Sequence, residues 1–117
     1  MNGDRLEAVS AKIREFRDAR DWKQFHNAKD MAAAISIEAS ELLEIFLWKS
    51  PGEVESASTA KRDRIEEEMA DVAIYLVELA DNLGIDLIDA MERKLERNAE
   101  KYPVEKARGS HAKYDEL

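Results

Sequence analysis

The sequence predicts an all-α protein, because helical periodicity occupies nearly the whole chain and the alternating pattern of half-buried strands is hard to find. The 117 residues include two prolines, four glycines and no cysteine, so few helix breaks and no disulfide framework are expected. The hydrophobic fraction of 44% is compatible with one folded core. We therefore expect a bundle of four helices.

The first two helices are expected over about residues 4–21 and from a cap at Asn27 to about Lys49. Asp30, three residues after Asn27, suits the start of a helix, and Ser50-Pro51-Gly52 is a typical stop. In the first helix, apolar residues recur at the spacing of one buried stripe: Leu6, Val9, Ile13 and Phe16.

The other two helices are expected over about residues 59–83 and from a cap at Asp86 to near Pro103. The segment 53–60 is rich in small and polar residues and is expected to be a loop. The apolar stripes of these helices are Ile65, Met69, Val72, Leu76, Leu79 and Leu83, and then Leu87, Ala90, Met91 and Leu95. We take residues 1–103 as the domain and residues 104–117 as a charged, irregular tail that could act as a lid over an active site.

The charge balance and the N-terminus narrow the class of protein. With 18 basic and 26 acidic side chains the formal net charge is −8, which argues against binding a nucleic-acid polymer. Acids interrupt every apolar stretch, so no membrane span is expected. The N-terminus lacks a basic segment followed by an apolar one, and we expect a cytoplasmic protein.

One acid of the expected second helix lies in the middle of its apolar stripe. On an ideal helix each residue turns by about 100°, so residues seven positions apart share a face. Four apolar residues fall within about 60° of Glu38 by this rule: Met31, Ile35, Leu42 and Ile45. Glu41 lies about 60° to one side of Glu38.

The expected third helix repeats this arrangement with Glu68 and Asp71, which border its apolar stripe beside Tyr75, whereas Glu66 and Glu67 point away. Burying four carboxylates together requires a cationic partner. An all-oxygen ligand set suits Mg²⁺ or Mn²⁺ rather than zinc. The alternative, surface acids on solvated helices, stays open. A di-iron bundle is disfavoured, because neither histidine follows a glutamate by three residues.

Acidic and aromatic motifs follow one another along the chain. Glu38-Ala-Ser-Glu41-Leu-Leu-Glu44 and Glu67-Glu68-Met-Ala-Asp71-Val-Ala-Ile-Tyr75 resemble the E-x-x-E and E-x-x-D metal motifs of the MazG-like, all-α nucleoside triphosphate pyrophosphohydrolases. The resemblance covers nearly the whole chain. Further segments are similar to the dCTP pyrophosphatase branch: Arg20-Asp21-Trp22, Gln24-Phe25-His26, Phe46-Leu47-Trp48-Lys49, Lys101-Tyr102-Pro103 and Lys113-Tyr114-Asp115-Glu116-Leu117.

This resemblance implies an activity and a set of site residues. The activity would be Mg²⁺-dependent cleavage of a (deoxy)nucleoside triphosphate, dCTP-like, between its α- and β-phosphates, in the service of nucleotide pool sanitation. The metal ligands would be Glu38, Glu41, Glu68 and Asp71, with Glu38 and Glu41 also the candidates for the catalytic base. The residues around the base, sugar and phosphates would be Trp22, His26, Trp48, Tyr75, Lys94, Asn98 and Lys101.

Other interpretations of these residues stay open. Trp22 and Trp48 are also compatible with core or interface packing, and Lys94, Asn98 and Lys101 with a solvated face. The chain as a whole is also compatible with a non-catalytic acidic helical module that binds a protein partner. One departure from the family pattern is Ile13, which stands where the vertebrate dCTP enzymes carry a histidine, so cytosine preference is in doubt.

The side of the second helix opposite Glu38 is also apolar or small: Ala32, Ser36, Ala39, Leu43 and Leu47. A helix that is apolar nearly all round is usually buried on both sides. We therefore expect a homo-oligomer with this helix at its interface, in keeping with the dimers and dimer-of-dimers tetramers of the family it resembles. The alternative is that another part of the same chain covers this side.

Overall fold

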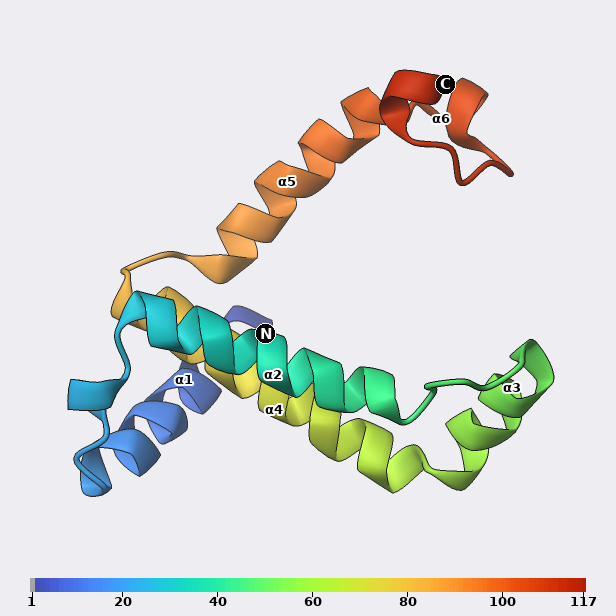
Figure 1. Cartoon of the computed structure of the whole chain (residues 1–117). Coiled ribbons are helices and arrows are strands. Elements are labelled where there is room, and N and C mark those ends of the chain that lie inside the picture. Colours follow the sequence, from blue (N-terminus) through green and yellow to red (C-terminus); the bar gives the residue numbers. More distant parts are fainter. Residues whose placement is uncertain (1) are drawn as a thin grey trace. The chain divides into compact units, whose positions relative to one another are not determined.

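The computed structural model describes residues 2–117, and their side chains from residue 5 on. Four long helices confirm the predicted all-α class: α1 (Asn2–Ala19), α2 (Ala28–Glu44), α4 (Arg62–Asn82) and α5 (Leu87–Lys101) (Figure 1). Two shorter helices and two single 3₁₀ turns complete the described chain, in which no strand occurs: α3 (Pro51–Ala60), α6 (Val104–Ala107), η1 (Lys23–Phe25) and η2 (Tyr114–Glu116).

The chain divides into two compact units, and the boundary between them in the sequence follows Gly84. In the first unit α4 packs against α1, α2 and α3, and α2 and α4 run side by side in opposite directions (Figure 1). The second unit contains α5, α6 and η2. In this unit the rings of Tyr102 and Tyr114 pack edge-to-face, with 6.2 Å between their centroids. The Lys101 ammonium lies 4.9 Å from the centroid of the Tyr114 ring. A domain boundary at residue 103 stays a prediction.

The prediction of a loop over residues 53–60 is wrong, because this segment belongs to helix α3. Ser50 caps its start: the hydroxyl accepts a hydrogen bond from the Glu53 backbone N–H at 3.3 Å, and the Glu53 carboxylate accepts one from the Ser50 N–H at 3.1 Å. Pro51 occupies the first turn, where its missing N–H costs nothing. The residues interpreted as a helix stop therefore serve as a helix start.

Replacing Ser50 by Ala is expected to lower the free energy of unfolding by about 0.5–2 kcal/mol, because one N-terminal N–H of α3 loses its acceptor. Thermal unfolding measures the change. The matched control is Ser58→Ala in the same helix, where the hydroxyl only bonds back to the Val54 carbonyl at 2.8 Å. This control should be neutral or slightly stabilising, and an equal loss in both variants would contradict the capping role.

Helix α2 ends at Glu44 rather than near Lys49, since the next residues form bonds of the i to i+3 type, from the Phe46 N–H to the Leu43 carbonyl at 2.9 Å and from the Lys49 N–H to the Phe46 carbonyl at 3.2 Å. Trp48, within this turn, has a φ of 62°. Positive φ is uncommon for a bulky residue. The expected helix therefore ends about one turn early.

The buried core of the described chain is small. The buried hydrophobic residues are Ile13, Met31, Ile45, Ala57 and Ala80. Many residues expected in apolar stripes are exposed instead, including Met69, Leu76, Leu83, Met91 and Leu95. Among the described helices, none has the length and apolarity needed to cross a membrane.

Candidate functional site

A cluster of three carboxylates lies where α2 and α4 face each other. Glu38 and Glu41 come from α2 and Glu68 from α4, and one oxygen of each lies within 4.8 Å of the other two. Glu38 occupies the centre of the α2 stripe as its phase predicted, since Met31 and Ile45, seven residues away on either side, are each 1% exposed. The helical periodicity of α2 thus aims an acid at α4.

The cluster has the properties of an oxygen-ligand cation site. Burial, reinforced by Glu41 and other neighbouring acids, raises the pKa of both Glu38 and Glu68 above the ordinary value of 4.5. One buried oxygen of each, Glu38 Oε2 and Glu68 Oε2, has no hydrogen-bond partner among the described residues. Such oxygens need a cation or a proton, so the residues present fit a divalent metal ion.

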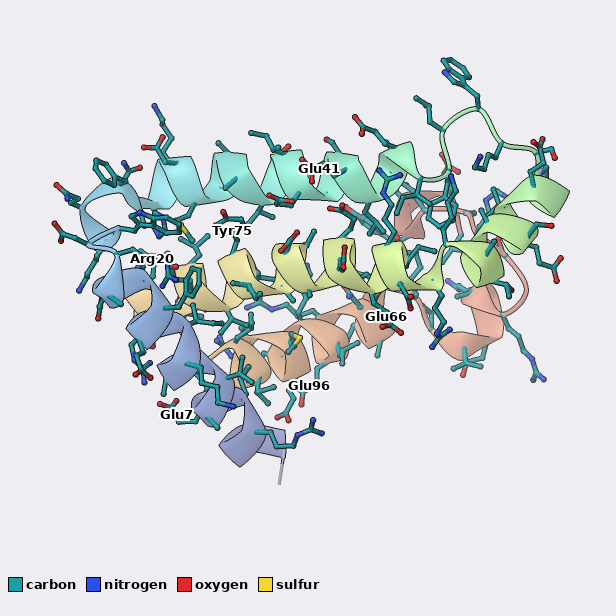
Figure 2. The ribbon with its side chains drawn as sticks, turned by 90° about the horizontal axis from the view of Figure 1, so that it is seen from below. Glu7, Arg20, Glu41, Glu66, Tyr75 and Glu96 are labelled. Atoms are coloured by element: carbon teal, nitrogen blue, oxygen red, sulfur yellow. The ribbon has the colours of Figure 1, made fainter. Side chains whose placement is uncertain are left out.

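The fourth predicted ligand, Asp71, is exposed and stands outside this three-acid cluster. Its charge nevertheless adds to the effect of burial that raises the pKa of Glu38 and Glu68. The pKa of Tyr75 is raised by burial first and then by the charges of Glu38 and Asp71. Tyr75 lies between α2 and α4, whereas Glu66 lies on the side of α4 away from α2 (Figure 2). Glu66 and Glu67 are exposed, as their phase predicted.

A cavity of about 530 Å³ adjoins the acids. Its size is within the range of sites that enclose a small molecule. Acidic residues in its wall are Glu38, Asp71 and Glu78, and the other lining residues are Val9, Lys12, Ile13, Phe16, Arg17, Trp22, His26, Ile74 and Tyr75. The cavity thus brings the predicted site residues Trp22, His26 and Tyr75 to the same place as two predicted metal ligands.

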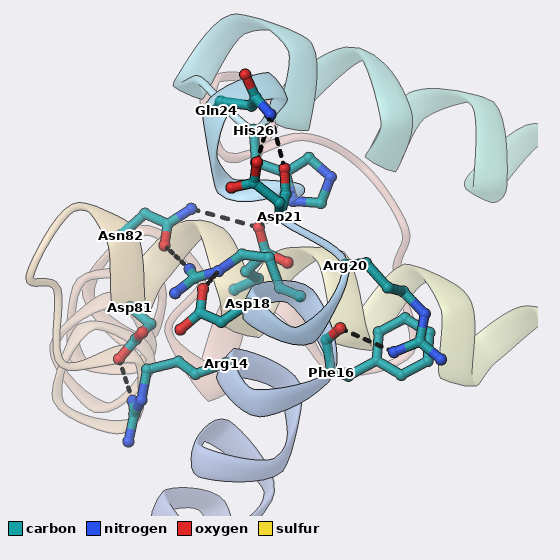
Figure 3. Close-up of polar contacts among 11 residues, drawn as sticks. Arg14, Phe16, Asp18, Arg20, Asp21, Gln24, His26, Asp81 and Asn82 are labelled. Atoms are coloured by element: carbon teal, nitrogen blue, oxygen red, sulfur yellow. Dashed lines mark hydrogen bonds and ion pairs between the residues drawn. The ribbon is translucent and has the colours of Figure 1, made fainter.

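Aromatic rings line the part of the wall formed by α1 and the turn after it. The rings of Trp22 and Phe16 pack edge-to-face with 5.8 Å between their centroids, and the centroids of the Trp22 and His26 rings are 6.2 Å apart. The Arg20 guanidinium lies over the Phe16 ring at 3.7 Å, and one of its N–H groups donates to the Phe16 carbonyl at 2.9 Å (Figure 3). These rings offer flat apolar surfaces for a stacked ligand.

Four predicted site residues lie away from this cavity or in the second unit. Trp48 is 92% exposed and does not line the cavity. Lys94, Asn98 and Lys101 lie along α5, with Asn98 partly covered and the two lysines exposed. Their roles stay predictions.

Two buried polar residues that line the cavity, Glu78 and Arg17, were not predicted from the sequence. Glu78 is 4% exposed and Arg17 is 3% exposed. The Glu78 carboxylate contacts His26 Nδ1 at 2.6 Å and accepts from Asn82 Nδ2 at 3.4 Å, while Asn82 Oδ1 accepts from Arg17 at 2.7 Å (Figure 3). A signal for Glu78 existed, since it follows Asp71 by seven residues and so lies within about 20° of it on the helix.

Comparisons with known proteins show which family this chain resembles. The chain is 40% identical to dCTP pyrophosphatase 1 of rat and of human over 114 residues, which cover 96% of this chain and 67% of each relative. A crystal structure of a pyrophosphatase from Archaeoglobus fulgidus superposes with a TM-score of 0.82 at 45% identity, covering 85% of this chain and 93% of that one. Residues 33–117 match the MazG-like family. The chain therefore belongs to the MazG-like family.

Proposed function

We propose that this chain is a nucleoside triphosphate pyrophosphohydrolase that cleaves a (deoxy)nucleoside triphosphate, dCTP-like, into the monophosphate and pyrophosphate. The observation that carries the proposal is the three-acid cluster with two buried, unpartnered oxygens, placed beside a cavity lined with aromatic rings. The acids suit a cation that accompanies phosphates, and the rings suit a base. The dCTP pyrophosphatase names of the relatives support the same substrate class.

The proposed metal is Mg²⁺, with Mn²⁺ as a substitute, held by Glu38, Glu41, Glu68 and Asp71. A bound divalent ion would offset the negative charge of the triphosphate and the charge that develops in the transition state. Glu38 and Glu41 are the candidates to take the proton of the attacking water. The better base is the one that binds metal less strongly, since its oxygen stays free for the proton.

Substrate contacts divide between the base and the phosphates. Trp22 and His26 would hold the base, and Tyr75 lies in the cavity wall beside the acids and would face the sugar. Lys94, Asn98 and Lys101 are proposed to approach the phosphates from α5, and Trp48 to complete the base pocket. We also propose a cytoplasmic location, where nucleoside triphosphates are available as substrates.

We further propose that the chain works as a homodimer or as a dimer of dimers, with α2 at the interface. The side of α2 opposite Glu38 is exposed throughout, and two of its residues, Leu43 and, just beyond the helix end, Leu47, show 63% and 48% of their surface. Exposed apolar residues gathered along one helix are typical of a protein interface. Trp48, in the turn that follows this helix, would then be covered by the second protomer.

The activity is tested by incubating the protein with a panel of dNTPs and Mg²⁺ and identifying the products. We expect a monophosphate and pyrophosphate, and no turnover after metal removal with a chelator. Release of orthophosphate would refute cleavage between the α- and β-phosphates. Absence of hydrolysis with every nucleotide would refute the enzyme and favour the alternative, an acidic helical module for a protein partner.

A further inference from the structure

Glu78 is a buried acid whose contacts are directed at one ring nitrogen of His26. Its carboxylate is 4% exposed and lies 2.6 Å from His26 Nδ1. An ionised carboxylate can accept hydrogen bonds but cannot donate them, so the contact with Glu78 favours the ring form in which His26 Nδ1 carries the hydrogen. This pairing leaves Nε2 as the ring nitrogen available to a ligand in the cavity that His26 lines.

A second layer of contacts holds Glu78 in place. Asn82 donates to the same carboxylate oxygen at 3.4 Å and accepts from the buried Arg17 at 2.7 Å. The Arg17 carbonyl in turn accepts from the Trp22 backbone N–H at 3.1 Å. The turn that carries Trp22 and His26 is therefore fixed to both α1 and α4.

Stability alone is a poor reason for this arrangement. Buried ion pairs are often no more stable than apolar residues of the same size, because both partners lose their water. Glu78 and His26 both line the cavity, whereas Arg14 and Asp81, which form an ion pair between α1 and α4 at 2.6 Å, do not. The contact of Glu78 with His26 is therefore placed where it can affect how a ligand binds in the cavity.

Ile13 lines the same cavity but, unlike His26, it is apolar. Its side chain is 9% exposed and offers no hydrogen bond to a ligand. Cytosine and thymine differ in their hydrogen-bonding edges, since cytosine carries a donor amino group where thymine carries an acceptor carbonyl. A ring nitrogen held in one orientation distinguishes these edges, whereas a freely rotating histidine offers either nitrogen.

We propose that Glu78 is a positioning residue that fixes the His26 ring, so that His26 Nε2 selects between nucleobases bound in the cavity. The inference rests on the proposed function, because it requires a nucleotide in this cavity. Glu78 touches no reacting atom, and its effect is exerted through His26.

The test compares Glu78→Gln with Asp81→Asn, a matched carboxylate-to-amide change one turn further along α4. For wild type and both variants, kcat and KM are measured with dCTP and with dTTP. Glu78→Gln should reduce the dCTP-to-dTTP preference, in whichever direction it runs, by roughly fivefold. The loss should appear in the KM of the preferred nucleotide rather than in kcat, and Asp81→Asn should keep the wild-type preference.

A spectroscopic measurement examines the ring directly. The chain has two histidines, His26 and His111, so nitrogen NMR of the imidazole groups with a His111→Asn reference assigns both. Wild type and Asp81→Asn should show a His26 Nδ1 that keeps its hydrogen. Glu78→Gln, whose side-chain amide can accept from Nδ1–H or donate to an unprotonated Nδ1, should show a mixture of the two ring tautomers. An unprotonated Nδ1 in wild type would refute the proposal.

The kinetic outcomes separate this proposal from the proposed function. Pyrophosphate release with equal preference in wild type and Glu78→Gln refutes the positioning role and leaves the enzyme intact. An equal change in both variants also refutes it, since the effect is then general to the contact of α1 with α4. If wild type releases no pyrophosphate from any nucleotide, the proposed function fails and base selection fails with it.

Discussion

Glu68→Gln is expected to lower turnover by roughly a hundredfold or more, because a carboxylate that holds the metal ion is lost and the ion supplies several kcal/mol of charge stabilisation. The same result is expected for Glu38→Gln, Glu41→Gln and Asp71→Asn. Pyrophosphate release from dCTP with saturating Mg²⁺ measures the effect. Full activity in any two of the four variants would contradict the assignment of four ligands.

The same substitutions that lower turnover should not lower the stability of the metal-free protein. The pKa of Glu38 and Glu68 is raised, first by burial and then by neighbouring acids, so the stability they contribute is present below about pH 4.5 and is lost as the pH rises through the raised values. At pH 7 these ionised acids oppose folding. Metal-free Glu38→Gln and Glu68→Gln should therefore melt no lower than metal-free wild type.

Mg²⁺ itself provides the second measurement. Added Mg²⁺ should raise the melting temperature of wild type, since it binds only the folded chain, and should raise that of the ligand variants much less. The controls are Glu66→Gln and Glu67→Gln, whose side chains are exposed. The Glu66 pair with Arg62 lies on the surface at 3.3 Å, and its loss should have little effect. A Mg²⁺ response lost equally in the controls would contradict a specific site.

Leu43→Glu is expected to split the assembly into monomers. Leu43 is 63% exposed in the single chain and lies in the last turn of α2, on the side opposite Glu38. A carboxylate introduced there would have to be buried between two protomers without a cationic partner, which is strongly unfavourable. Light scattering at micromolar concentration should give the mass of a dimer or tetramer for wild type and of a monomer for the variant.

The matched control is Thr59→Glu, which adds the same charge at an exposed position of α3. It should keep the oligomeric mass and the activity of wild type. A monomeric wild type with full activity would contradict the proposal, as would an assembly that Leu43→Glu leaves unchanged.

Local patterns predicted the four long helices and the three acids of the cluster. The phase of Glu38 between Met31 and Ile45 depends only on helical geometry, and the structure has both flanking residues buried. Helix α3 was missed because its stripe is weak, and its start is set by the reciprocal contacts of Ser50 and Glu53. The same three residues, Ser-Pro-Gly, are compatible with a stop before them and a start after them.

The sequence by itself determined the all-α class, the family and the faces on which Glu38, Glu41 and Glu68 lie, because helical phase and motif order are local properties of the chain. Only the tertiary structure decided which faces meet. The contact of His26 with Glu78 joins residues 52 positions apart, and Trp48 lies outside the cavity despite its place in the motif. Such pairings depend on how α1 and α2 pack against α4. They cannot be predicted from a local pattern, because packing direction and turn geometry are set by many weak contacts acting together.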